Sequence, residues 1–378
     1  GNAVLFIMID LSAAFDTVDV DILLCTLDSL GVKGKAAAWL CSYLEHRRQH
    51  VVIGDAKSNP LTSKYGVPQG SVLGPILFTI YMTSLGHLLR HHNVEYHCYA
   101  DDTQIWMPFE PHRLDDTIHR MELCLADVQR WMAHFKLKMN NSKTELLIIA
   151  NPRLAKEHDF NRIISLDGVE ISPSKKAVRN LGVQMKADMS LNEQVSLISR
   201  ACFAQIKNIQ RIKKFLDKKT LAMVIHSFVT SRMDYCNSLL LGAPAYLIKK
   251  MQRIQNAAAR LLTDTAVYEH ITPVLRDLHW LTVHKRIMFK VLLIVFRVLH
   301  DCAPTYLNVF SERTSTDNRR SLRFYTCYNL NVPFTSSNLV FNRSFTVAAP
   351  RLWNSLPPSI KHAPDIIVFK KLLKTHLF

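Results

Sequence analysis

An unbroken apolar run near the start of the sequence predicts the first structural element. Seven consecutive apolar residues extend from Ala3 to Ile9, and Asp10 follows them directly. A continuous run of this length is typical of a strand that is buried on both faces. The acid after such a strand lies at its carboxyl end, where the sheets of α/β proteins place their ligands. Asp10 is therefore the first candidate functional residue.

Two adjacent acids, Asp101 and Asp102, interrupt a second apolar region between Val94–Ala100 and Ile105–Met107. Successive strand residues point to opposite faces, so two acids in the middle of a strand would bring one charge into the core at a high cost. A tight turn avoids this cost and favours Asp. Two carboxylates held close together also raise a pKa unless a cation lies between them. The pair predicts a divalent-metal site, although a solvated hairpin turn would also explain it.

Asp10 and the acid pair together would supply hard oxygen ligands of the kind that Mg²⁺ prefers. Two such ions can clamp the attacking and leaving oxygens of an in-line phosphoryl transfer. Two Mg²⁺ ions, or Mn²⁺ in their place, are therefore the expected cofactors.

A pattern of helical period begins at Val195 and predicts an amphipathic helix. Its further apolar positions are Ile198, Cys202, Ile206, Ile209 and Leu216. Basic residues fill much of the remaining surface, among them Arg200, Lys207, Arg211 and Lys214. A cationic outer face can follow the phosphates of a duplex, and an ordinary solvated surface helix is the alternative.

Three short motifs follow one another in the order of reverse transcriptase motifs A, B and C. They read DLSAAFD at residues 10–16, GVPQGS at 66–71 and YADD at 99–102. NNSKTEL at 140–146 resembles motif D, and NLGV at 180–183 resembles motif E, the primer grip. The sequence resembles the reverse transcriptases of non-LTR (LINE-type) retrotransposons of the jockey and chicken-repeat-like group. LHWL at 278–281 and AAPRLWN at 348–354 extend this resemblance to the C-terminal part.

The resemblance implies roles for residues at matching positions. Asp10 and Asp101 would ligate the metals with the Leu11 carbonyl, and Asp102 would be a weaker ligand. Lys143 would be the general acid for the leaving pyrophosphate, and a solvated turn is the alternative. The expected nucleotide-binding residues are Phe15, Gln69, Gly70 and Tyr99, and the expected primer–template residues are Leu181, Gly182 and the four basic residues named above. Phe15 matches the steric gate that excludes a 2′-OH, and a core aromatic is the alternative interpretation.

The fold implied by the resemblance is an α/β palm, followed by an α-helical thumb and a mostly helical C-terminal region. The palm, with an antiparallel-type sheet and helices, is expected over residues 1–185, the thumb over 186–262 and the last region over 263–378. The activity implied is RNA-directed DNA polymerase, which extends a DNA primer on an RNA template with deoxynucleoside triphosphates. We also expect a fragment without fingers or endonuclease, so a catalytically incomplete nucleic-acid-binding remnant or a scaffold is the alternative.

Composition narrows the partners and the compartment. Lys plus Arg is 47 and Asp plus Glu is 31, and the net charge of +16 favours a polyanionic partner. The eight cysteines are spread singly, without zinc-site spacing and without a sign of a disulfide framework, which fits a reducing intracellular compartment. The expected localisation is intracellular, in the cytoplasm and nucleus. No apolar run approaches the ~20 residues that span a bilayer, so no membrane partner is expected.

The pattern of the C-terminal region predicts helices separated by irregular segments. One or two helices are expected over Leu275–His300, a polar linker over Asp317–Arg323 and short β-like runs over Asn329–Val347. Pro350 is expected to break the chain, and a last helix is expected over Ile366–Leu377. The expected core residues are Trp280, Ile287, Phe289, Leu292 and Phe296. Trp353 is interpreted as a packing anchor, with base stacking beside Arg351 as the alternative.

Overall fold

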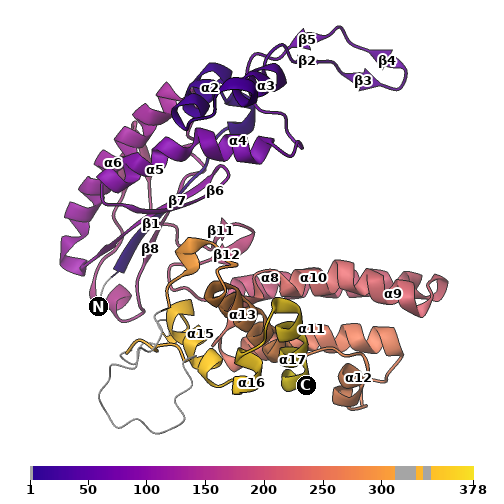
Figure 1. Cartoon of the computed structure of the whole chain (residues 1–378). Helices are drawn as coiled ribbons and strands as arrows, with labels where there is room; N and C mark the ends of the chain where they lie inside the picture. The colour runs from indigo at the N-terminus through magenta and orange to yellow at the C-terminus, as the bar shows by residue number, and fades with distance from the viewer. Residues whose placement is uncertain (1–2, 311–328, 335–341) are drawn as a thin grey trace. The chain divides into compact units, whose positions relative to one another are not determined.

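The computed structural model describes residues 3–310, 329–334 and 342–378 (Figure 1). The chain forms two compact units, Gly1–Met189 and Ser190–Phe378. The first unit is mixed α/β with antiparallel sheets, and the second is largely helical. This is the fold class that the sequence predicts. The boundaries of the expected palm, thumb and C-terminal region remain predictions.

A four-stranded antiparallel sheet forms the centre of the first unit, in the order β6-β7-β1-β8. Its strands are β1 (Ala3–Ile9), β6 (Glu95–Tyr99), β7 (Asp102–Phe109) and β8 (Glu145–Ile149). The apolar strand β1 pairs with β7 on one side and with β8 on the other. This central place explains why its sequence is a continuous apolar run.

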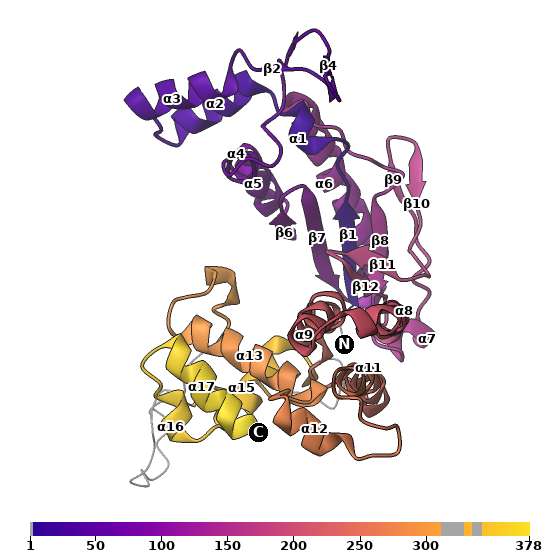
Figure 2. The ribbon, with the colours of Figure 1, turned by 90° about the vertical axis from the view of Figure 1, so that its right-hand side faces the viewer.

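The two faces of the sheet are covered differently. Leu5, Ile7 and Ile9 alternate along β1 and enter the main core with helices α5 (Thr83–His91) and α6 (Leu114–His134) (Figure 2). The intervening residues Val4, Phe6 and Met8 face a smaller cluster with Trp106 and Leu147. The hairpin β11 (Val178–Asn180)–β12 (Val183–Met185) covers part of that second face through Val178 and Met185. In the described part of the chain, no helix contributes to this smaller cluster.

Helices and a ribbon arm lie between β1 and β6 in the sequence. The helices are α1 (Ala14–Thr17), α2 (Val20–Ser29), α3 (Gly34–Leu44) and α4 (Gly74–Tyr81). The arm consists of β2 (Arg48–Gln49) paired with β5 (Leu61–Thr62) and of β3 (Val52–Ile53) paired with β4 (Ala56–Lys57). Figure 1 shows the arm standing out from the first unit, and its strand residues are exposed. The remaining short elements are η1 (Pro111–Arg113), α7 (Leu154–Glu157), β9 (Ile164–Leu166) and β10 (Val169–Ile171).

The second unit is built on two helical cores. The first core joins α8 (Asn192–Ile212), α9 (Lys218–Ile225), α11 (Ala245–Thr263) and α12 (Ile271–Asp277), and it extends to Trp280 and Ile287. The second core joins α13 (Val283–Leu299), α15 (Phe345–Asn354), α16 (Pro358–Lys361) and α17 (Ile366–Leu377). Shorter turns complete the unit: η2 (Lys213–Phe215), η3 (His226–Thr230), α10 (Ser231–Asp234), η4 (Asn237–Leu240) and η5 (Thr305–Leu307).

Several expectations for the C-terminal region can be compared with this unit. The last helix has the predicted bounds, and two helices occupy 271–299. Trp280, Ile287, Leu292 and Phe296 are buried, and Phe289 packs partly buried against the second core. Trp353 is 1% exposed and packs near Phe369, which makes it a packing anchor.

Two expectations for this region were wrong. Pro350 does not break the chain, because it lies inside α15 and is buried there with Ala349. The β-like runs expected over Asn329–Val347 form no named strand in their described part, and α15 begins at Phe345 instead. Ala349 and Trp353 lie four residues apart on α15 and are both buried in the second core, and this burial decides the outcome over the local strand propensity. The linker expected at Asp317–Arg323 lies outside the described residues.

Candidate active site

Asp10 and Asp102 meet at one end of the central sheet. Ile9 of β1 pairs with Thr103 of β7, and Met8 pairs with Gln104. One residue further along the same register, Asp10 comes opposite Asp102, the first residue of β7. Asp10 continues the alternation of Val4, Phe6 and Met8, so both acids belong to the face of the smaller cluster. Side chains opposite one another in antiparallel strands lie about 5 Å apart at their Cβ atoms.

A tight turn carries the third acid, Asp101. Tyr99 pairs with Asp102, so Ala100 and Asp101 alone connect β6 to β7. Ala100 has a φ of 54°, which is a left-handed conformation that costs energy for a residue other than glycine. The hairpin turn predicted for the acid pair is therefore present. Tyr99 is 63% exposed beside the turn.

The acids interact electrostatically. The pKa of the Asp102 carboxyl is raised above its ordinary value, first because the carboxyl is partly withdrawn from water and then because Asp101 and Asp10 are negatively charged neighbours. Like charges held together disfavour a further charge, and a bound cation reverses this effect. The turn therefore concentrates negative charge at one point of the sheet.

The backbone after Asp10 is held by the loop before β8. The Asn140 amide donates to the Asp10 carbonyl at 2.8 Å, and the Ser12 amide donates to the Lys138 carbonyl at 2.9 Å. Leu11 and Met139 between them form an antiparallel bridge. In such a pair the flanking residues make the hydrogen bonds, so the carbonyl of Leu11 points away from Met139. This direction leaves the Leu11 carbonyl oriented toward the β7 side of β1.

Lys143 lies in the same loop. The amides of Lys143 and Thr144 both donate to the Asn140 carbonyl, at 3.1 and 3.0 Å. The Lys143 side chain is exposed. The loop therefore ties Lys143 to the residue that also holds the Asp10 carbonyl.

The first residues of the second motif are held against the helix that follows Asp10. The Gly66 amide donates to the Val18 carbonyl at 2.7 Å, and the Val67 amide donates to the Phe15 carbonyl at 2.9 Å. Phe15 stacks on Phe78 of α4 with ring centroids 4.4 Å apart. The Gln69 side-chain amide donates to the Asp16 carboxylate at 2.9 Å. The short helix α1 is thus tied to α4 through Phe15 and to the second motif through Asp16.

Gly70 and the primer-grip hairpin are turns that need unusual backbone angles. Gly70 has a φ of 77°, and Leu181 and Gly182 have φ values of 44° and 80°. Asn180 pairs with Val183, so these two residues form a two-residue hairpin turn with positive φ at both positions. The Gln104 amide donates to the Asn180 side chain at 2.7 Å, which ties this hairpin to β7.

Sequence reasoning missed four residues that support this arrangement: Arg47, Asp16, Gln104 and Asn180. Gln104 could have been found from its spacing, because a residue two positions after Asp102 shares its face of the strand. The contact between Asp16 and Gln69 spans 53 residues of sequence and had no local signal.

Tyr81 links two further parts of the first unit, because its hydroxyl donates to the Phe135 carbonyl at 2.5 Å and accepts from the Asp19 amide. Burial raises the pKa of this hydroxyl to about 12.

The fit of a divalent ion can be judged from the donors. Among the described residues, no group of three or more His, Cys, Asp or Glu side chains is arranged to hold a metal ion by itself. Mg²⁺ commonly uses one or two carboxylates together with waters and substrate phosphates. The carboxylates of Asp10, Asp101 and Asp102 and the Leu11 carbonyl are all hard oxygen donors, and their mutual repulsion favours a cation. The residues present therefore fit an ion that the substrate helps to bind.

The four basic residues expected to contact primer and template lie in the second unit. Arg200, Lys207 and Arg211 are exposed on α8, and Lys214 is exposed in the following turn. Val195, Ile198, Cys202, Ile206 and Ile209 are buried on the opposite side of α8, as predicted. Leu216 was wrongly expected on the same helix, because α8 ends at Ile212 and the backbone at Leu216 is extended after the turn η2. Lys213 forms an ion pair with Asp264, so it is engaged elsewhere.

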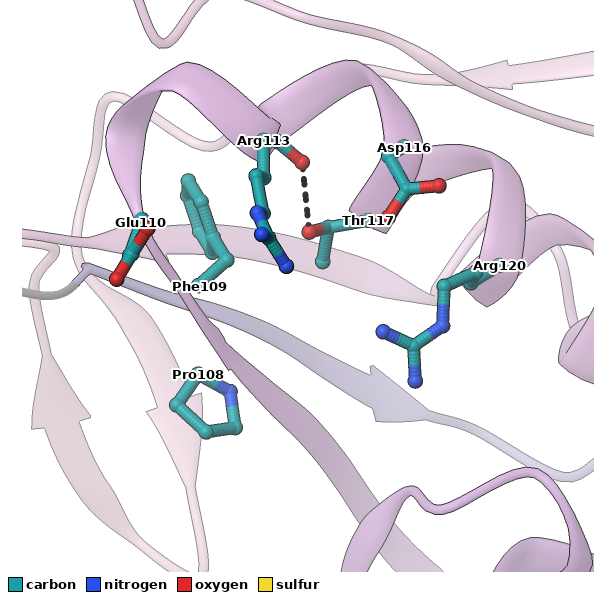
Figure 3. Close-up of a pocket in the computed structure, with 7 residues that line it drawn as sticks. All are labelled: Pro108, Phe109, Glu110, Arg113, Asp116, Thr117 and Arg120. Atoms are coloured by element: carbon teal, nitrogen blue, oxygen red, sulfur yellow. Dashed lines mark hydrogen bonds between the residues drawn. The ribbon is translucent and has the colours of Figure 1, made fainter.

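A separate open pocket of about 210 Å³ lies where β7 ends and α6 begins (Figure 3). Arg113, Arg120 and Asp116 line it with Phe109 and Glu110. Phe109 is the last residue of β7 and Asp102 is the first, so the pocket lies at the opposite end of the strand from the acids. The pocket is therefore distinct from the candidate active site.

Comparison of the sequence with known proteins identifies the family to which the first unit is similar. The family of reverse transcriptases (RNA-dependent DNA polymerases) matches residues 1–185. The chain is 27% identical over 301 residues to the probable RNA-directed DNA polymerase from transposon BS of Drosophila melanogaster, covering 74% of this chain and 31% of the relative. The corresponding polymerase of the mobile element jockey, from the same organism, is 23% identical over 63% of this chain and 26% of the relative.

Residues 1–185 are a reverse transcriptase domain. The domain is related to the RNA-directed DNA polymerases of the Drosophila non-LTR retrotransposons BS, X-element and jockey. The chain spans about a third of the length of these relatives or less.

Among solved structures, apo telomerase from Candida tropicalis is similar over 75% of this chain and 47% of its own, with a TM-score of 0.41 and 12% identity. Telomerase from the same organism with a fragment of telomeric RNA is similar over 76% of this chain and 47% of its own, with a TM-score of 0.38 and 13% identity.

Across the described ranges of this chain, no helix has the length and apolar character needed to cross a membrane.

Proposed function

We propose that this chain catalyses RNA-directed DNA synthesis, adding deoxynucleotides to a DNA primer 3′-OH on an RNA template. The observation that supports this most directly is the placement of Asp10 opposite Asp102, with Asp101 in the adjoining turn. Asp10 comes from a part of the sequence distant from the Asp101–Asp102 pair, and the pKa of the Asp102 carboxyl is raised by its partial burial and then by the negative charges of Asp101 and Asp10. Two Mg²⁺ ions, or Mn²⁺, would neutralise the pyrophosphate and activate the primer hydroxyl when bound.

The proposal also gives the other candidate residues the roles that the family resemblance implies. Asp10 and Asp101 would hold the ions with the Leu11 carbonyl, and Asp102 would support them. Phe15, which is partly buried and stacked on Phe78, would contact the sugar of the incoming nucleotide. Gln69, Gly70 and Tyr99 line the site of the same nucleotide. Lys143, which is exposed in its loop, protonates the leaving pyrophosphate. Leu181 and Gly182 hold the primer end, and Arg200, Lys207, Arg211 and Lys214 contact the primer–template backbone.

Primer extension on an RNA template tests this proposal. We expect the full chain to extend a DNA primer with Mg²⁺ and the Asp101→Asn, Asp102→Asn variant to give no product. Replacing carboxylates by amides keeps the size of each side chain but removes two charges that the ions require. Extension that survives this double replacement would rule out the proposed role of the acids.

A second candidate function is nucleic-acid binding without catalysis, as a remnant of a polymerase. The exposed basic face of α8, in a unit with its own cores, supports this candidate. A soluble, folded chain that fails to extend a primer but binds an RNA–DNA duplex would favour it, provided that the affinity falls steeply with salt. Absence of binding at low salt would leave a scaffold derived from the same fold.

A further inference from the structure

Arg47 makes a connection that none of the motifs accounts for. It lies between α3 and the first strand of the arm, and its side chain is half-buried. Its Nε donates to the Leu44 carbonyl at 3.0 Å, and its Nη2 donates to the Tyr65 carbonyl at 3.0 Å. The same Nη2 also donates to the Gly66 carbonyl. One guanidinium therefore joins the end of α3 to the start of the loop that carries Gln69.

Gly66, which accepts a hydrogen bond from Arg47, lies directly against the backbone of α1. Gly66 has a φ of 82°, and a Cβ added there would come within 3.0 Å of the backbone of Phe15 and Asp16. The loop is thus in direct contact with α1 at this point. The Val67 amide donates to Phe15 of α1, and the Gly66 amide donates to Val18 just beyond this helix. Any shift of the Gly66 carbonyl would weaken these two hydrogen bonds and move Gln69 relative to Phe15.

We propose that Arg47 is a positioning residue for the nucleotide site, which acts by holding the loop of residues 65–69 against Phe15. The inference rests on the proposed polymerase function. A guanidinium suits this task because its donors are fixed in one plane and can serve several carbonyls at once, whereas a lysine ammonium acts as a single flexible point charge. The Ser63 amide donates to the Arg47 carbonyl at 2.8 Å, so the base of the arm and the loop share this anchor.

Hydrogen exchange tests the structural part of the proposal without requiring activity. We expect Arg47→Ala to accelerate exchange at the amides of Gly66 and Val67, and Arg48→Ala to leave them unchanged. Arg48 is the matched control because it is adjacent, carries the same charge and is exposed. Arg47→Lys should give intermediate protection and serves in place of the alanine variant if that variant does not fold. Unchanged exchange in both Arg47 variants would overturn the proposal.

Nucleotide kinetics then test its functional part. Misplacing a substrate-positioning group by about 1 Å can lower the efficiency of an enzyme about 100-fold. We therefore expect the KM for the deoxynucleotide to rise about 10- to 100-fold in Arg47→Ala. The kcat should change much less, and Arg47→Lys should restore part of the affinity. A fall in kcat at unchanged KM would overturn the positioning role. An inactive parent with altered exchange in Arg47→Ala would instead contradict the proposed function and leave the anchoring role intact.

Discussion

The two units of the chain carry their functional evidence in different ways. In residues 1–189, the candidate residues are brought together by backbone geometry: a register between β1 and β7, a turn at Ala100 and a close approach at Gly66. In residues 190–378, most of the candidate residues are basic side chains on the outer face of α8. The other side of α8 and the remaining helices are arranged by burial of apolar side chains in two cores. The function proposed for the first unit depends on the exact positions of a few side chains, whereas nucleic-acid binding by the second unit depends on the total positive charge of its surface.

This difference predicts different responses to substitution. One replaced carboxylate should abolish the chemistry of the first unit, whereas several lysines or arginines must be removed to affect the second. Packing residues of the second unit should affect stability alone. The following experiments test this contrast, beginning with the largest expected effect.

Trp353→Ala should destabilise the second unit by about 3–5 kcal/mol, because truncating a fully buried aromatic leaves a large cavity. Thermal or denaturant unfolding measures this loss. Trp353→Phe is the control and should recover much of the stability. If Trp353→Ala instead weakened RNA binding without lowering stability, the side chain would be a base-stacking residue and the contrast would fail.

Phe15→Val should relax the exclusion of ribonucleotides by roughly 10- to 100-fold, since a smaller side chain leaves room for the 2′-OH. Incorporation of ribonucleotides against deoxynucleotides measures the change. Phe78→Leu removes the stacked partner but keeps the gate, so it should lower stability with a smaller effect on discrimination. Equal discrimination in the parent and Phe15→Val would identify Phe15 as an ordinary core aromatic.

Neutralising Arg200, Lys207, Arg211 and Lys214 to Gln should reduce the salt dependence of duplex binding. For each phosphate that the variant no longer neutralises, the slope of log K against log salt should become about 0.9 less steep. Binding measured from low to moderate salt gives this slope. Single replacements should have small effects, and one replacement that abolished binding would contradict the charge-based account of α8.

Gly182→Ala should destabilise the first unit by about 1 kcal/mol, because its φ of 80° is unfavourable for a residue with a Cβ. Thermal unfolding measures the change. Gly168→Ala is the matched control, because Gly168 also has a positive φ, of 74°, but lies in the β9–β10 hairpin. The two variants should be similarly destabilised, and only Gly182→Ala should impair primer extension.

The pH dependence of stability should show the smallest effect. The raised pKa of Asp102 means that the folded state holds its proton more tightly than the unfolded state. The parent should therefore gain stability as the pH falls through the raised pKa toward the ordinary value near 3.8. Asp102→Asn lacks this response and should be slightly more stable than the parent at neutral pH. The midpoint of thermal unfolding at several pH values tests this, and a parent advantage that grows with pH would contradict it.

Much of the first unit could be predicted from the sequence because its signals are local. The apolar run before Asp10 and the acid pair at Asp101 lie where the sequence indicates, at a strand end and in a tight turn. The buried face of α8 follows directly from helical periodicity. These features need no information about distant residues.

The remaining features depend on contacts between distant parts of the chain. Nothing near Arg47 in the sequence indicates that it holds Gly66, and nothing near Asp16 indicates Gln69. Pro350 has a strong local tendency to end a helix, yet burial of the surrounding side chains places it inside α15. Supporting residues of this kind become visible only when the fold brings their partners together.

The most direct test of the account is single-nucleotide incorporation by Asp10→Asn compared with Asp28→Asn. Both variants lose one carboxylate, but Asp28 is exposed on α2 and has no part in the proposed site. The account predicts parent-like incorporation by Asp28→Asn and a loss of at least about 100-fold by Asp10→Asn, which removes a metal ligand. Similar incorporation by both variants would contradict the claim that the acids at the end of β1 and β7 form the active site.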